Sequence, residues 1–139
     1  MAEAKEMQAG TFVWNELTTR DTEAAKAFYQ RLFGWKFQTA PQHAEYNLIV
    51  APGGREQGIG GMMKMGMEYP KDQPASWTPY IGVENVDKTC EEAEANGGTI
   101  QVPPTNIPDV GRFAMLKDPT GATFCVIAFK SGVYGQGCA

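Results

Sequence analysis

The sequence predicts an α+β domain built from two tandem modules that share the order strand, helix, strand, strand, strand. Its 139 residues fit one compact domain. Segments with strand character and amphipathic helical segments occur twice in the same order, and Trp14 and Thr78, like Gly34 and Gly98, lie about 64 residues apart. We therefore expect a first module at about 10–65, a second at about 77–130, and a flexible tail at 131–139.

The first module opens with a predicted strand at residues 12–19, which combine β-branched and aromatic side chains with partial alternation. A helix of about three turns follows, since apolar residues recur there at spacings of three and four. Asp21 or Thr22 offers its N-cap, and Gly34 ends it. Further strands are expected at 35–39, 46–51 and 57–65.

The second module repeats this pattern. Residues 77–84 read as a strand, Asp87 is a plausible cap for a second helix, and Asn96-Gly97-Gly98 ends that helix. The turn Asp118-Pro119-Thr120-Gly121 fits a tight hairpin. Three further strands are expected, at 99–103, 112–117 and 122–129.

Each predicted module has one helix for four strands, so its sheet has one covered face and one bare face. Pairing the two bare faces would make a cleft between the repeats. Such a cleft is a usual place for a small ligand. The expected partner is therefore a small apolar or aromatic molecule.

Composition excludes several other partners. A net charge of −4 and scattered basic residues argue against nucleic acid. The chain has no apolar run of transmembrane length, so no membrane partner is expected. The first ten residues lack the apolar core of a signal peptide, and the three cysteines suit free thiols better than a disulfide framework. These features predict a cytoplasmic protein.

Motifs in both halves resemble one family. The stretch TFVWNEL at 11–17 precedes Asp21, AFY at 27–29 and LFGW at 32–35, and the second half contains VENVD, NGG and DPTG in order. Together these resemble the vicinal-oxygen-chelate superfamily, which includes glyoxalases, bleomycin resistance proteins and dioxygenases. The resemblance implies tandem βαβββ modules that form a curved mixed sheet around a cleft. It also implies a homodimer.

Metal-dependent enzymes of that family hold a divalent metal with His and Glu side chains from both modules. By resemblance, the ligand positions fall on Trp14, within Gly60–Met62, on Thr78 and on Cys125. None of these residues is His or Glu, and the single histidine, His43, is expected in a loop. We therefore expect no bound metal and no cofactor.

Two residues are candidates for acid–base chemistry. Strand alternation places Glu16 on the same face as Trp14, and Tyr80 on the same face as Thr78. Glu16 could act as a general base or accept a hydrogen bond from a ligand. Alternatively it is a solvated carboxylate, or one paired with Arg20 or Arg112. Tyr80 could donate its hydroxyl to a ligand or simply pack with that hydroxyl satisfied.

Aromatic and thioether side chains could form the wall of a ligand site, although each could equally be ordinary core. Cys125 lacks a visible base nearby, which favours a buried thiol over a nucleophile. Trp77 could join the same wall. The ligand-binding candidates are Trp14, Tyr46, Met62, Thr78, Met115 and Cys125.

Three functions are consistent with the sequence. The leading hypothesis is a metal-free small-molecule-binding protein, such as one that sequesters a drug or toxic metabolite. The second is a metal-independent enzyme that uses Glu16 as acid or base, with Tyr80 as donor. The third is metal-dependent lyase or dioxygenase chemistry of the resembled family.

Overall fold

The computed structural model describes residues 8–40, 43–53, 58–67 and 69–130. Within them the chain forms two compact units. We call residues 14–77 the first module, and residues 8–13 together with 78–130 the second module. The strands Phe12–Thr19 and Ser76–Gly82 cross these boundaries, and each is described with the module that holds most of its residues. Both modules contain helix and sheet, which confirms the predicted α+β class; the predicted cleft stays a prediction.

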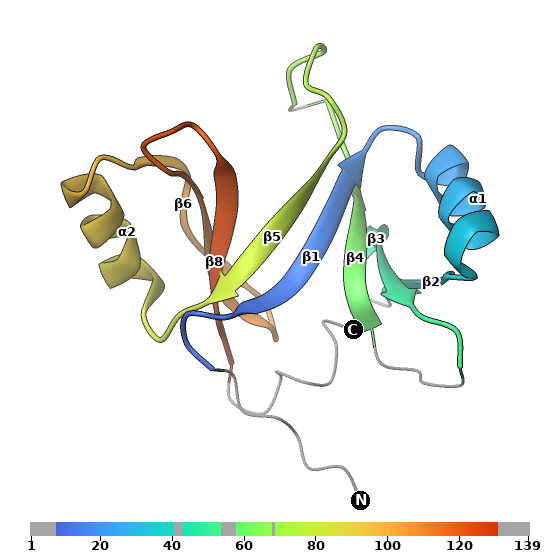
Figure 1. The fold of residues 1–139 in the computed structure, drawn as a ribbon, viewed down its shortest axis with the longest axis horizontal. Helices are drawn as coiled ribbons and strands as arrows, with labels where there is room; N and C mark the ends of the chain where they lie inside the picture. Colours follow the sequence, from blue (N-terminus) through green and yellow to red (C-terminus); the bar gives the residue numbers. More distant parts are fainter. Residues whose placement is uncertain (1–7, 41–42, 54–57, 68, 131–139) are drawn as a thin grey trace, which may run out of the picture. The chain divides into compact units, whose positions relative to one another are not determined.

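The first module has a mixed sheet with the strand order β2-β3-β4-β1 (Figure 1). β4 is antiparallel to β3 and parallel to β1. The helix α1 lies between β1 and β2 in the chain and contacts β2 and β4. Its elements are β1 (Phe12–Thr19), α1 (Thr22–Phe33), β2 (Lys36–Ala40), β3 (His43–Val50) and β4 (Gly58–Lys64).

The second module repeats this topology, with the strand order β5-β8-β7-β6. Here β8 is antiparallel to β7 and parallel to β5. The predicted βαβββ repeat is therefore confirmed, in strand direction as well as in element order. The elements are β5 (Ser76–Gly82), α2 (Val86–Ala95), β6 (Thr99–Ile107), β7 (Gly111–Lys117) and β8 (Thr123–Phe129).

Both helices begin at a side-chain N-cap. The Asp21 carboxylate accepts a hydrogen bond from the Ala24 N–H at 3.0 Å, so Asp21 rather than Thr22 is the cap. In α2 the cap is Asn85, whose side-chain oxygen accepts from the Lys88 N–H at 3.0 Å. The prediction of Asp87 as cap is wrong, because the helix starts earlier and Asp87 lies in its first turn.

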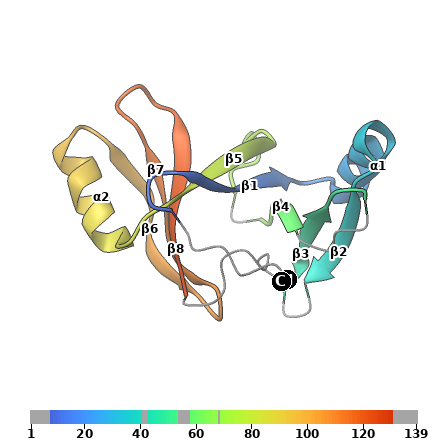
Figure 2. The same cartoon turned by 60° about the horizontal axis from the view of Figure 1, so that its bottom comes forward.

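The core of the second module lies between α2 and the sheet of β6, β7 and β8 (Figures 1 and 2). Alternate residues of a strand point to opposite faces, so only every second residue of β7 and β8 reaches the helix. The buried members of this core are Val86, Cys90, Ala114, Leu116 and Val126.

The helix α1 differs from α2 in burial, because none of its twelve residues is buried. The predicted helix is present, yet Phe28, Leu32 and Phe33 are about half exposed. Beside it, Tyr29, Trp35 and Trp77 form a ring cluster with centroids 5.3–6.0 Å apart. The Trp77 Nε1–H donates to the Tyr29 hydroxyl at 3.1 Å.

Two local predictions need correction. His43 is the first residue of β3 rather than part of a loop, and its side chain lies outside the described residues. β6 continues to Ile107, beyond the predicted end at 103, because its register with β7 shifts between Val102 and Thr105. That irregularity accommodates Pro103 and Pro104, which lack a backbone donor, on an edge strand.

Among the described residues, no helix has both the length and the apolar character needed to cross a membrane.

Candidate functional site

One face of the first module's sheet brings three predicted site residues together. The register places Glu16 opposite Gly61, and Gly61 opposite Leu48. Trp14 lies two residues before Glu16, and Tyr46 two residues before Leu48, so strand alternation puts both side chains on the same face. We call these five residues the Trp14 face.

The two rings of the Trp14 face are fixed to each other. The Trp14 Nε1–H donates to the Tyr46 hydroxyl at 2.9 Å. A Cβ added at Gly61 would lie 1.8 Å from that hydroxyl oxygen and 2.3 Å from Tyr46 Cζ. The phenol therefore covers the backbone of Gly61, and any side chain at this position would displace it.

Met62 does not belong to this face. It lies opposite Leu17 in the register, and Leu17 points away from Trp14 and Glu16. The predicted wall containing both Trp14 and Met62 is therefore split between two faces of the sheet. Met63 takes the place expected for Met62, since it lies opposite Tyr46.

The equivalent face of the second module carries the other candidates. Tyr80 lies opposite Cys125, and Cys125 opposite Met115. The ring of Phe113, two residues before Met115, lies 6.5 Å from the Tyr80 ring. Thr78 shares this face by alternation. These residues, which we call the Tyr80 face, point away from the core beneath α2.

Burial differs along the Tyr80 face. Thr78 and Tyr80 are each 7% exposed and Cys125 is 0% exposed, whereas Met115 and Phe113 are partly exposed. Met115 and Phe113 therefore offer more surface to a ligand than the thiol does. Burial also raises the pKa of the other described thiol, Cys90, which disfavours its reactive thiolate.

The repeat favours Gly61 within the range Gly60–Met62 to which the resemblance assigns the ligand position of β4. Glu16 opposite Gly61 in the first module matches Tyr80 opposite Cys125 in the second. By the resemblance, the four positions that hold metal in family enzymes would fall on residues that carry an indole, a glycine, a hydroxyl and a thiol: Trp14, Gly61, Thr78 and Cys125.

These four residues do not fit a divalent metal of that type, which is held by imidazole and carboxylate groups. At Gly61 the space for a ligand side chain is filled by the Tyr46 hydroxyl. In the part of the chain that the structure describes, no group of three or more His, Cys, Asp or Glu side chains converges as a metal site.

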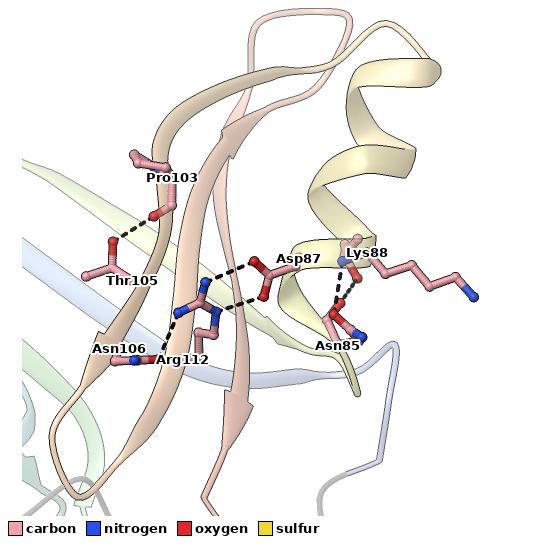
Figure 3. Close-up of polar contacts among 8 residues, drawn as sticks. Asn85, Asp87, Lys88, Pro103, Thr105, Asn106 and Arg112 are labelled. Carbon is pink, nitrogen blue, oxygen red and sulfur yellow. Dashed lines mark hydrogen bonds and ion pairs between the residues drawn. The ribbon is translucent and has the colours of Figure 1, made fainter.

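The two arginines suggested as partners of Glu16 have other partners. The guanidinium of Arg20 donates to the carbonyl of Gln73 at 2.6 Å and to that of Pro70. Arg112 lies in the second module, where it makes two hydrogen bonds to Asp87 (2.8 and 2.9 Å) and one to Asn106 (Figure 3).

The contact with Arg112 is part of the scaffold rather than of either candidate face. It joins the first turn of α2 to β7, and Asn106 extends it to β6 (Figure 3). The hydrogen bonds from Arg112 hold the pKa of the Asp87 carboxyl below its usual value. Asp118 likewise has a lowered pKa, chiefly through its hydrogen bond from the Thr120 hydroxyl.

Sequence reasoning left out Phe113, missed the role of Gly61 and grouped Met62 with Trp14. Phe113 could have been found, because it precedes Met115 by two residues in a predicted strand. The role of Gly61 depends on the ring of Tyr46 from a neighbouring strand, which no local pattern reveals. Trp77, another candidate for the ligand wall, contacts Tyr29 and Trp35.

Comparisons with known proteins agree with this fold. The family model described as "Glyoxalase/Bleomycin resistance protein/Dioxygenase superfamily" matches residues 11–126. The chain is 38% identical over 120 residues to the "Putative glyoxylase CFP32" of Mycobacterium bovis, covering 86% of this chain and 44% of that protein. It is 28% identical over 137 residues to the "Anthracycline biosynthesis protein DnrV" of Streptomyces peucetius, with coverages of 89% and 48%. The chain thus spans less than half the length of these curated relatives.

Solved structures show the same fold at low identity. A Mn(II)-bound glyoxalase from Novosphingobium aromaticivorans superposes with a TM-score of 0.61 at 18% identity, covering 93% of this chain and 41% of that one. A methylmalonyl-CoA epimerase variant from Streptomyces coelicolor gives a TM-score of 0.61 at 12% identity, with coverages of 91% and 99%. With the repeated topology and the match over residues 11–126, we conclude that the chain belongs to the glyoxalase/bleomycin resistance protein/dioxygenase superfamily.

Proposed function

We propose that this chain binds a small aromatic molecule without using a metal ion. The observation that carries the proposal is the contact of Tyr46 with Gly61 and Trp14. At a position where family enzymes provide a metal ligand, this chain has a glycine covered by a phenol. The inferred ligand position on β1 carries the indole of Trp14, which holds the Tyr46 phenol in place through a hydrogen bond.

The side chains of each face, taken by itself, suit a flat, largely apolar ligand. Tyr46, Met115 and Phe113 are partly exposed and present ring and thioether surface. One relative is named for anthracycline biosynthesis, and anthracyclines are flat polycyclic aromatic compounds. That name supports an aromatic ligand class here without identifying the ligand.

The test is a binding titration with acridine, a flat tricyclic probe, in buffer containing EDTA. We expect saturable binding that Trp14→Phe and Tyr46→Phe each weaken about threefold to tenfold, because both changes release the fixed ring pair. Trp35→Phe is the matched control, since Trp35 belongs to the separate cluster with Tyr29 and should leave the affinity unchanged. Binding that requires added divalent metal, or no saturable binding at all, would contradict the proposal.

A second candidate is a metal-independent enzyme with Glu16 as its acid or base. It is favoured by the register, which sets this partly buried carboxylate opposite a residue without a side chain, next to the fixed rings. Glu16→Gln should then abolish turnover of any substrate found while binding persists. Unchanged turnover in that variant would remove the candidate.

A further inference from the structure

We infer that two copies of this chain pair through the outward side of α1, with the two helices antiparallel about a two-fold axis near Phe28. The inference goes beyond the proposed binding function and does not depend on it. Three features of α1 carry it: which of its side chains are exposed, how their sizes are ordered along the helix, and where its charges lie.

The exposed side of α1 is more apolar than that of an ordinary surface helix, which turns its apolar side inward. The half-buried residues lie along one side of the helix and include a threonine and a lysine: Thr22, Ala25, Lys26 and Tyr29. The opposite side is exposed and mostly apolar. We call it the α1 outer face, and its residues are Ala24, Ala27, Phe28, Arg31 and Leu32.

Two large side chains make the α1 outer face an interaction surface. Phe28 and Leu32 are one helical turn apart and are 55% and 52% exposed. The Phe28 ring lies 5.1 Å from the Tyr29 ring, so the apolar surface continues towards the exposed ring of Trp77. Contiguous apolar surface of this kind marks a site of association.

The sizes of the side chains fit a second copy of the same helix. Ala24 and Leu32 lie about 6 Å on either side of Phe28 along the helix axis. In an antiparallel pair centred at Phe28, Leu32 of each copy is level with Ala24 of the other. Each large side chain then lies against a small one, which is the self-complementarity that a two-fold interface requires. A parallel pair would set Leu32 against Leu32.

The charges favour the same antiparallel order. Glu23 lies in the first turn of α1 and Arg31 in the last turn, and both are exposed. In the antiparallel pair, Arg31 of one copy is about 3 Å along the axis from Glu23 of the other, within reach of these long side chains. Glu23 contacts Lys26 within α1 at 3.2 Å, yet its side chain remains 84% exposed and can also accept from an arginine. Two equivalent ion pairs therefore form across the axis.

The charge of the chain argues against an anionic membrane as the alternative occupant. Helices that bind such membranes have a polar side rich in lysine and arginine. In α1 the bases are Lys26 and Arg31, and the whole chain has a net charge of −4. A pair of short helices buries less than the roughly 800 Å² per partner of a standard interface. We therefore expect a weak dimer, with a Kd of about 10–100 µM.

Sedimentation equilibrium of the whole chain, at loading concentrations from about 5 to 500 µM, measures this association. Phe28→Glu should weaken the dimer at least about tenfold, because it brings two carboxylates together at the two-fold axis. Phe12→Glu is the matched control, since it makes the same change at a side chain that is 72% exposed on β1. The control should keep the Kd of the wild type within about twofold.

A charge exchange tests the antiparallel order separately. Arg31→Glu should weaken the dimer about threefold to tenfold, because it sets an acid beside Glu23 of the other copy. Adding Glu23→Arg should restore the association, since the ion pairs then form with reversed polarity. Circular dichroism of each variant checks that α1 is retained.

Three results would overturn the inference. The first is a wild-type chain that stays monomeric throughout the concentration range. The second is a dimer that persists unchanged in Phe28→Glu, because another surface would then form it. The third is a double variant that keeps its helix content and still associates as weakly as Arg31→Glu alone.

Discussion

The two modules share a backbone plan but differ in how they use it. Both helices start at equivalent N-caps, Asp21 and Asn85, and both sheets pair their first strand in parallel with their last. Yet α2 buries Val86 and Cys90 in a core, whereas the equivalent positions of α1 are Thr22 and Lys26, neither of which is buried.

The sheet faces differ in the same way. Glu16 and Gly61 of the first module stand where Tyr80 and Cys125 stand in the second. The first module thus presents a carboxylate near fixed rings, and the second an aromatic and thioether surface. The two modules therefore share strand positions and register, while the chemistry of each position is set by its own side chain.

The largest expected difference is in the unfolding free energy lost when a leucine is truncated in the α2 core or on α1. Leu116→Ala removes a side chain that is 0% exposed in the α2 core and should cost about 2–5 kcal/mol of unfolding free energy. Leu32→Ala, the same change on α1 at a side chain that is 52% exposed, should cost less than about 0.5 kcal/mol. Urea denaturation of both variants measures the contrast. Equal losses would mean that α1 is packed as tightly as α2.

The next effect concerns Gly61. Gly61→Ala forces the Tyr46 ring away and should destabilise the protein by about 1–3 kcal/mol. Adding Tyr46→Ala removes the clash, so the double variant should be more stable than the sum of the two single losses by at least about 0.5 kcal/mol. Strictly additive losses would show that the ring does not lie on Gly61.

The two N-caps should behave alike, which tests the equivalence of the modules. Asp21→Ala and Asn85→Ala each remove a side-chain acceptor from the first helical turn and should each cost about 1 kcal/mol. Thermal denaturation of both variants provides the measurement. A loss of stability in only one of the two variants would show that the two caps are not equivalent.

The smallest effect is the pH dependence of the contact between Asp87 and Arg112. Because hydrogen bonds from Arg112 lower the pKa of Asp87 in the folded chain, their contribution is present above the ordinary value of 3.8 and is lost as the pH falls through the lowered one. Asp87→Asn should therefore lose less stability than the wild type between about pH 5 and pH 2. Thermal unfolding across that range checks this, and identical acid profiles would contradict it. Asp118, whose pKa is also lowered, keeps some acid sensitivity in the variant.

Much of this architecture could be predicted from local patterns. The element order and the stop at Gly34 follow from residue types at fixed spacings, and both are confirmed; of the two predicted caps, Asp21 and Thr22, the structure has Asp21. Alternation along single strands also grouped Trp14 with Glu16 and Thr78 with Tyr80, and each pair lies within one continuous strand, β1 or β5.

Relations between strands could not be predicted this way. Met62 was assigned to the wrong face because a shift of one residue reverses every side chain of a strand, and only the pairing of Leu17 with Met62 decides it. The helix α1 has the apolar spacing of a core helix, yet Phe28 and Leu32 are exposed. Spacing predicts which residues share a face of a helix, and tertiary packing decides whether that face is covered.

The central proposal is that this family member works without metal, because the residues at the inferred ligand positions do not suit one. Elemental analysis of the chain, purified after expression in medium supplied with manganese, zinc, nickel and iron, tests this most directly. The account predicts well under one metal ion per chain, with acridine affinity unchanged by EDTA. One tightly held metal ion per chain, lost together with acridine binding when Thr78 and Cys125 are replaced by alanine, would contradict it.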